Sequence, residues 1–176
     1  MRIWVPDIEA PLRHQMVFSL YKKPKSWKRA MPKLSASGKP FMIKNEGDRE
    51  HQHDILQAFT RKATELRLLD IFPWEGPVAL QVYNYFVKPQ SHWPGKEFQQ
   101  RPDIDNLAKQ VMDALNPKGV GGWGAYLDDS QVVDLTASKR YDGRGDIISV
   151  QLLLFERVTK PLKVRGKRGS GTENRR

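Results

Sequence analysis

The chain has 176 residues, of which 39% are hydrophobic, and this fits one folded domain with its own core rather than a disordered chain. It contains no cysteine, no apolar run long enough to cross a bilayer and no signal-peptide core at its start, so a soluble cytoplasmic protein without disulfides or thiolate metal sites is expected. The formal net charge is +10, which makes a polyanion the expected partner.

The first half of the chain is predicted to contain two strands and a helix. Residues 16–21 are typical of a strand, and residues 22–40, rich in Lys, Pro, Ser and Gly, of a loop. Residues 47–69 carry apolar side chains at helical spacing, and Pro73 is expected to stop this helix. Residues 78–87 alternate between two largely apolar sets, which predicts a strand covered on both faces.

The clearest helix of the sequence follows a loop at residues 90–100. Its apolar stripe consists of Leu107, Ala108, Val111, Met112 and Leu115. Asp103 or Asp105 could cap the start of this helix, and Asn116-Pro117 is expected to end it.

Two strands are expected at the end of the folded part. A Gly-rich loop at residues 119–124 precedes a predicted strand at residues 130–139. A turn signal at residues 142–145 separates it from an apolar strand at residues 147–155, so these two strands should form an antiparallel hairpin. From residue 159 onward the chain is Lys, Arg, Gly and Ser, which predicts a disordered tail.

These elements predict an α+β (mixed α/β) fold, a single domain over residues 1–157 with a mixed sheet and two main helices, followed by a basic tail at residues 158–176. Residues 22–44 hold 8 Lys or Arg and no acid, and the tail has a net charge of +6, whereas residues 45–157 have a net charge of −4. Basic arms attract a polyanion without reading its sequence, and an acidic middle repels it unless a cation is bound there. The pattern favours a metal-dependent nuclease, with solubility alone as the alternative.

Four carboxylates stand out, Asp103 and Asp105 at a helix entrance and Asp128 and Asp129 before a strand. Mg²⁺ prefers oxygen ligands, and metal ions held by clustered Asp activate water and neutralise a leaving oxygen in phosphodiester cleavage. Alternate residues of an extended segment point the same way, so Asp103 and Asp105 could face one ion, while Asp129 would reach it from another element. Taken singly, each of these acids is better explained as a helix cap or a turn residue.

Three strings of residues contain these acids: Arg101-Pro102-Asp103-Ile104-Asp105-Asn106-Leu107-Ala108-Lys109, Asp113-Ala114-Leu115-Asn116 and Leu127-Asp128-Asp129-Ser130-Gln131-Val132-Val133. Together they resemble the RusA family of Holliday junction resolvases, often prophage-encoded, whose pattern is R-x-D-x-D-N-x-x-K, then D-A-L, then D-D-x-Q-V. The resemblance covers about residues 101–139. A longer loop at residues 116–126, a longer and more basic N-terminal loop and the extra tail depart from the family and leave the junction sequence preference open.

The resemblance implies a small α/β domain that dimerises, with two active sites on one face. It assigns the metal-binding and catalytic roles to four residues: Asp103, Asp105, Asp129 and Lys109. Asp128 becomes a further candidate ligand, and Asn106 and Gln131 fall on supporting positions. The implied function is a structure-selective endonuclease that resolves Holliday junctions and other branched DNA by Mg²⁺-dependent symmetric nicking, with Mn²⁺ as a candidate substitute, in recombination and repair.

Basic and aromatic residues add candidates for DNA contact. Lys109 lies one helical turn after Asp105, where its ammonium can stabilise phosphate charge; the alternative is an ion pair worth about 0.3–0.5 kcal/mol. The basic candidates are Lys25, Lys28, Arg29, Arg101 and Lys139, although Lys139 is better explained as a residue that lines an exposed strand face. Among three loop tryptophans that could stack on unpaired bases, Trp27, Trp93 and Trp123, the last is the strongest candidate because it lies between the acidic strings.

Other classes of function explain the sequence less well. A non-catalytic nucleic-acid-binding protein accounts for the basic arms but not for an acidic cluster between them. A Ser-His-Asp hydrolase would need a nucleophile elbow, which the sequence lacks. A zinc site at His51 and His53 is disfavoured because residues two apart near a helix start point in different directions.

Overall fold

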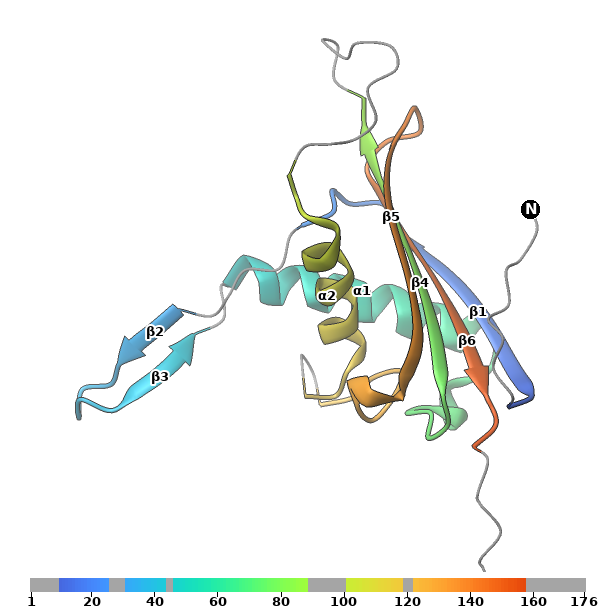
Figure 1. Ribbon diagram of the computed structural model, residues 1–176, viewed down its shortest axis with the longest axis horizontal. Helices are drawn as coiled ribbons and strands as arrows, with labels where there is room; N and C mark the ends of the chain where they lie inside the picture. Colours follow the sequence, from blue (N-terminus) through green and yellow to red (C-terminus); the bar gives the residue numbers. More distant parts are fainter. Residues whose placement is uncertain (1–9, 26–30, 44–45, 89–100, 119–121, 158–176) are drawn as a thin grey trace, which may run out of the picture.

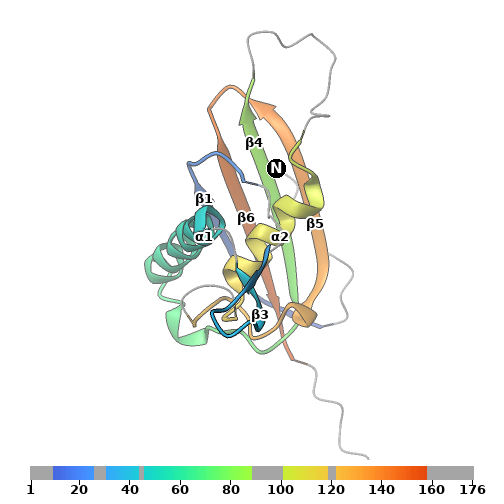
Figure 2. The same ribbon diagram turned by 90° about the vertical axis from the view of Figure 1, so that its left-hand side faces the viewer.

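A four-stranded mixed sheet forms the centre of the computed structural model, which describes residues 10–25, 31–43, 46–88, 101–118 and 122–157. Two helices cover one face of this sheet, and a separate two-stranded hairpin extends away from it (Figure 1; Figure 2). The predicted α+β class, with a mixed sheet and two main helices, is confirmed. None of the described helices is long and apolar enough to span a membrane.

The sheet has the strand order β1-β6-β4-β5, with β1 at Leu12–Leu20, β4 at Val78–Val87, β5 at Val132–Asp142 and β6 at Ile147–Phe155. β6 runs antiparallel to both β1 and β4, whereas β4 and β5 are parallel. The predicted bounds of β4 and β6 are confirmed. β4 is buried on both faces over its first half, and the face turned away from the helices becomes partly exposed towards its end.

The predicted antiparallel hairpin between the last two strands is wrong, because β4 lies between β5 and β6. β6 is buried at almost every position, so its backbone requires a neighbouring strand on both sides, whereas β5 carries Asp134, Lys139 and Arg140 and forms an edge. The turn that joins them passes the end of β4, where Asp146 Oδ1 accepts a hydrogen bond of 2.9 Å from the backbone N–H of Val87.

The first helix, α1 (Glu46–Glu65), buries the predicted apolar stripe as far as Ala63. It ends before the predicted residue 69, because Arg67 has a φ of 57°, which a right-handed helix does not allow. A short 3₁₀ turn, η1 (Leu69–Ile71), then leads to Pro73. Helix termination therefore comes from the backbone at Arg67 rather than from the proline.

The second helix, α2 (Ile104–Leu115), is amphipathic and ends at Asn116 as predicted. Its buried side packs with α1 and the sheet in one core, which includes an aromatic cluster of Phe18, Phe59, Phe72 and Trp123. The ring centroid of Trp123 lies 5.4 Å from that of Phe59 and 6.5 Å from that of Phe72. The interpretation of Trp123 as a base-stacking residue is therefore wrong, because its ring packs against the edge of the core.

Part of the segment predicted as a loop forms a hairpin of β2 (Met31–Leu34) and β3 (Pro40–Ile43). Its strands hydrogen-bond only to each other within the described residues. Several other expectations lie outside those residues: the loop at residues 90–100, the tail from residue 158, Lys28, Arg29, Trp27 and Trp93.

The connection after α2 is tightly packed against the helix end, which makes Gly124 sensitive to substitution. A Cβ atom at Gly124 would lie 2.2 Å from the backbone oxygen of Leu115, the same oxygen that accepts a 2.7 Å hydrogen bond from the Ala125 N–H. We expect Gly124→Ala to lower the free energy of unfolding by about 1–3 kcal/mol, measured by urea denaturation. Gly143→Ala is the matched control, since a Cβ there meets no atom within 4 Å. Equal stability of the two variants would contradict the close approach.

Candidate functional site

Two carboxylates lie at the start of α2. Asp103 occupies the N-cap position with φ −71° and ψ 145°, and its side chain makes no capping hydrogen bond. Asp105 lies in the first helical turn, and both side chains are exposed. The Asp103 side chain therefore does not act as a hydrogen-bonding cap of α2. Both carboxylates are accessible to a ligand from solution.

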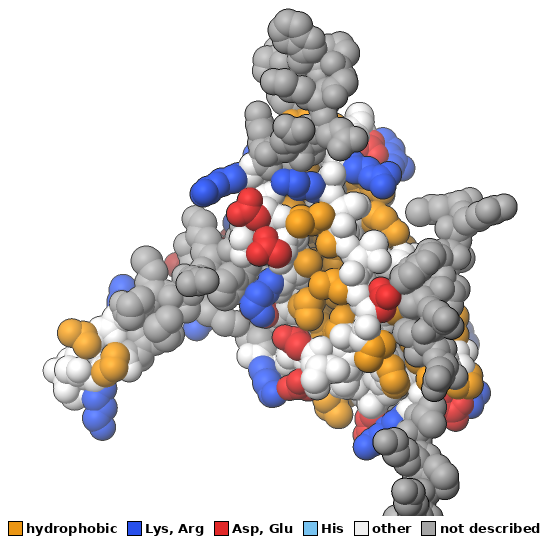
Figure 3. All heavy atoms as spheres, in the orientation of Figure 1, with side chains coloured by type: hydrophobic (Ala, Val, Ile, Leu, Met, Phe, Trp, Pro, Cys, Tyr) orange, Lys and Arg blue, Asp and Glu red, His pale blue; other side chains and the backbone are white. Residues whose placement is uncertain are grey.

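Basic residues lie beside this acidic pair. The Nζ of Lys139, on β5, donates a 3.1 Å hydrogen bond to the backbone oxygen of Pro102, directly before Asp103. Lys109 lies one turn after Asp105. Its Nζ forms an i, i+4 ion pair with the Asp113 carboxylate at 3.0 Å, one turn further along the helix. Figure 3 shows acidic and basic side chains together on the face that α2 presents. A phosphate near the acidic pair would meet ammonium groups within the same surface.

The other two predicted carboxylates lie beyond the opposite end of α2, at the 3₁₀ turn η2 (Asp129–Gln131). Asp129 Oδ1 accepts a 2.8 Å hydrogen bond from Asn116 Nδ2, directly after the last residue of α2. Asp128 pairs with Lys118 at 2.6 Å, and its carboxylate accepts from the backbone N–H of Ser130. The Lys118 ammonium and this backbone hydrogen bond hold the pKa of the Asp128 carboxyl well below its usual range.

Gln131 holds η2 against the sheet. Its Nε2 donates to the backbone oxygens of Trp74 at 2.9 Å and Gly76 at 3.0 Å, and its Oε1 accepts from the backbone N–H groups of Leu127 and Asp128. The expectation that Gln131 is a supporting residue agrees with these contacts. From the sequence, Asn116 was expected only to end α2, and its hydrogen bond to the Asp129 carboxylate adds a second role as a residue that positions this acid.

The acidic pair and Asp129 are separated by the length of α2. Its 12 residues correspond to about 18 Å at a rise of about 1.5 Å per residue. The Tyr126 hydroxyl donates a 3.1 Å hydrogen bond to the Met112 oxygen in the last turn of α2. Burial, and then the negative charges of Asp129 and Asp113, raise the pKa of this hydroxyl. Within the described residues no group of three His, Cys, Asp or Glu is placed to hold a metal ion. One copy of the chain therefore does not bring the predicted triad together.

The basic arm is attached to α1 through a buried histidine. His51 Nε2 accepts a 3.4 Å hydrogen bond from the backbone N–H of Lys25, whose exposed Nζ lies 3.4 Å from the Gly47 oxygen. Burial, together with the nearby positive charges of Lys25 and Lys22, lowers the pKa of His51 to about 4. His51 is fully buried while His53 is exposed, so the two imidazoles lie in different environments.

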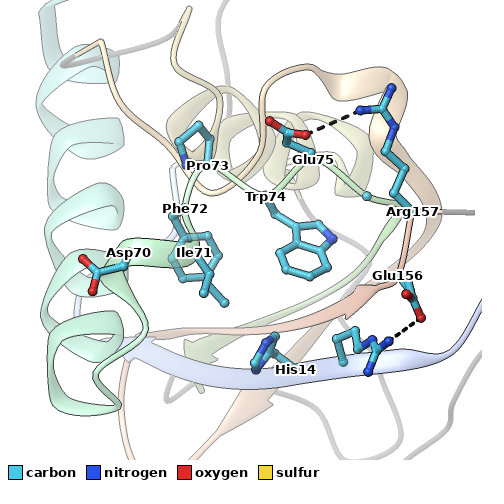
Figure 4. A pocket seen from close by; sticks show the side chains of 11 residues that line it. His14, Asp70, Ile71, Phe72, Pro73, Trp74, Glu75, Glu156 and Arg157 are labelled. Carbon is cyan, nitrogen blue, oxygen red and sulfur yellow. Dashed lines mark hydrogen bonds and ion pairs between the residues drawn. The ribbon is translucent and has the colours of Figure 1, made fainter. Parts of the chain in front are cut away.

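A hollow of about 520 Å³ lies beside the ends of β1 and β6 (Figure 4). Its floor is apolar, and the rings of His14 and Trp74 meet edge to face with centroids 5.8 Å apart. Two ion pairs lie on its rim, Arg13–Glu156 at 2.6 Å and Arg157–Glu75 at 3.5 Å. Because both of its arginines are already paired with glutamates, the hollow offers less for phosphate chemistry than the start of α2.

The residues of the surface around α2 lie within a region that matches a known protein family. A family profile described as "Endodeoxyribonuclease RusA" matches residues 32–152, which include α2, η2 and β5. A curated protein described as "Uncharacterized protein YqaN", from Bacillus subtilis (strain 168), is 39% identical over 77 residues, covering 38% of this chain and 50% of that protein. The chain thus spans about half the length of this relative.

Proposed function

Because the chain belongs to the RusA family of endodeoxyribonucleases, we propose that it resolves Holliday junctions and other branched DNA by nicking two strands symmetrically, in recombination and repair. The observation that carries this proposal is the exposed pair Asp103 and Asp105 at the start of α2, with basic residues beside it. The Asp103 side chain makes no hydrogen bond that caps the helix. Carboxylates exposed within a basic surface suit a cation that bridges protein and phosphate.

Asp103, Asp105 and Asp129 are proposed to hold Mg²⁺, with Asp128 as a further candidate and Mn²⁺ as a substitute. Such an ion supplies an activated water and neutralises the leaving oxygen. Asp128 is the weaker candidate, since Lys118 already neutralises its charge. Lys109 is proposed to stabilise the negative charge that develops on the phosphate, turning from Asp113 towards the DNA.

We further propose that the protein acts as a homodimer whose sites are shared between copies. Asp103 and Asp105 lie at the start of a helix about 18 Å long, whereas Asp129 is hydrogen-bonded to Asn116 beyond its end. Carboxylates at opposite ends of such a helix cannot bind one ion, because Mg–oxygen distances are only about 2.0–2.1 Å. A two-fold axis that runs perpendicular to α2 and passes beside its middle would make the two copies of this helix antiparallel. The C-terminal end of α2 in one copy would then lie next to the start of α2 in the other. Asp129 of a second copy would then complete the site that Asp103 and Asp105 begin.

The edge strand β5 is the surface proposed for this dimer. Among the described strands, β5 pairs only with β4, and its side chains Val133 and Leu135 are 55% and 45% exposed. An unpaired edge strand with exposed apolar side chains is a template for association. β5 also begins directly after η2 and runs alongside α2, so an interface here would involve both ends of the helix.

Cleavage of a synthetic four-way junction, beside a linear duplex of the same sequence, tests the proposed function. We expect paired nicks on the junction alone in Mg²⁺ and their complete loss in EDTA, because the carboxylates cannot activate water by themselves. Replacing Mg²⁺ by Mn²⁺ should restore the nicks. Tight junction binding without nicks in either metal would instead indicate a binding protein in which the acids are structural.

A further inference from the structure

Among the residues that the structure describes, the strands of the β2–β3 hairpin pair with no other strand. Figures 1 and 2 show it reaching away from the sheet and helices, and its two strands form a sheet of their own. An isolated two-stranded hairpin is only marginally stable in water, so an element of this kind gains order from what it binds. The hairpin lies within residues 22–44, which hold 8 Lys or Arg and no acid.

The tip of the hairpin is a closed turn. The backbone N–H of Ser35 donates to the Lys39 oxygen and that of Gly38 to the Ser35 oxygen, both at 2.9 Å. Ser35 Oγ accepts from the Lys39 N–H at 3.0 Å, and Gly38 takes a φ of +76°, which favours glycine. These contacts define the turn of the formed hairpin, and they place Leu34 and Lys39 at the same end of its two strands.

The side chain beside this turn is apolar and exposed to solvent. Leu34 is 72% exposed, more than any other large aliphatic side chain among the described residues. Lys33, before it, and Lys39, at the other side of the turn, are also exposed. Apolar side chains of this kind insert between base steps in proteins that open or bend DNA, and neighbouring lysines neutralise phosphates. A protein partner is less suited to this tip, since the whole surrounding segment carries only positive charge.

We propose that the β2–β3 hairpin is a DNA-contacting finger, in which Leu34 inserts among the unstacked bases of a branch point while Lys33 and Lys39 contact the adjacent phosphates. This inference rests on the proposed function, because it presupposes a branched DNA substrate. In this proposal, Leu34 on the β2–β3 hairpin recognises the branch point, and the carboxylates at α2 take part in cutting the DNA. Recognition and cleavage then belong to different elements. Leu34 should therefore affect how the DNA is distorted more than how tightly it is held.

The test uses the full-length chain in Ca²⁺ with a four-way junction that carries 2-aminopurine at the branch point. We expect the unaltered protein to raise 2-aminopurine fluorescence at saturation, because the base loses its stacking neighbour. Leu34→Ser should lose most of this rise while Kd changes less than about threefold, since an uncharged residue contributes little to counterion release. Lys33→Ala with Lys39→Ala should weaken binding and reduce the salt dependence by about one phosphate contact for each lysine.

Leu66→Ser is the matched control, because Leu66 is 42% exposed and follows the end of α1 opposite to the hairpin. It should behave like the unaltered protein. A Leu34→Ser variant that retains the full fluorescence rise, while the unaltered protein binds and cuts junctions, would overturn the finger alone. Conversion of the protein to a monomer by Leu34→Ser, measured by sedimentation equilibrium, would also overturn it and assign the hairpin to a contact between copies. Failure of the unaltered protein to prefer junctions over linear duplex would overturn the proposed function and this inference together.

Discussion

Replacement of Asp105 by Asn is expected to reduce cleavage of a four-way junction by more than about 100-fold, since even residues that only support a metal ligand contribute about 10–100-fold. The amide keeps the size of the side chain but removes the charge that would bind the cation. Junction affinity should be unchanged or higher, because one negative charge near the phosphates is lost. Nicking rates and Kd, measured on the same junction, give the two quantities.

Asp70→Asn provides the control for Asp105→Asn. Asp70 is an exposed acid on η1, outside the surface formed by α2, so its variant should cut at the original rate. If Asp105→Asn instead lowers the free energy of unfolding or weakens DNA binding, the residue is structural. Thermal unfolding of both variants distinguishes a folding defect from a loss of chemistry.

Mixing two inactive variants should restore cleavage. We expect Asp105→Asn and Asp129→Asn each to be inactive alone, and a mixture of the two, exchanged through the monomer, to recover about a quarter of the active sites. The reason is that half of the dimers would be mixed, and each mixed dimer would contain one site with all its carboxylates and one site that lacks two. The recovered activity should give single nicks rather than paired ones.

The same mixture distinguishes shared sites from sites made within one copy. If Asp105 and Asp129 of a single chain acted together, every site in the mixture would lack one carboxylate and no cleavage would return. A mixture of Asp105→Asn with Asp103→Asn serves as the control, because both residues lie at the start of the same helix and should not complement each other. Complementation in that control would contradict the assignment of both carboxylates to one half of the site.

The parts of the fold that depend on local pattern were predictable from the sequence. The bounds of β4 and β6 follow from alternating or continuous apolar residues, and the end of α2 follows from Asn116-Pro117. The β2–β3 hairpin was not predictable, because its two short strands lie in a segment rich in Lys, Pro, Ser and Gly, a composition typical of a loop. The partner of β5 was predicted wrongly, since a tight turn shows that two strands are close but not that they are neighbours.

In the candidate site, too, the local features were predictable from the sequence and the long-range ones were not. Asp103 and Asp105 are two residues apart, so their common position at the start of α2 could be predicted from spacing. The distance to Asp129 depends on the path of the chain from β4 through α2 to β5, which no local pattern encodes. The hydrogen bond from Asn116 to Asp129 and the contacts of Gln131 with Trp74 and Gly76 become visible only when that path is known.

Candidate carboxylates lie at the start of α2 and beside its end, so the length of this helix sets the distance between them. In the proposed dimer, the distance between the two cutting sites depends on the number of residues from Ile104 to Leu115. One additional turn would move the first carboxylates by about 5.4 Å, and one additional residue would rotate them by about 100° about the helix axis. If the protein acts as the proposed dimer, an insertion within α2 would therefore change where the two DNA strands are cut relative to each other.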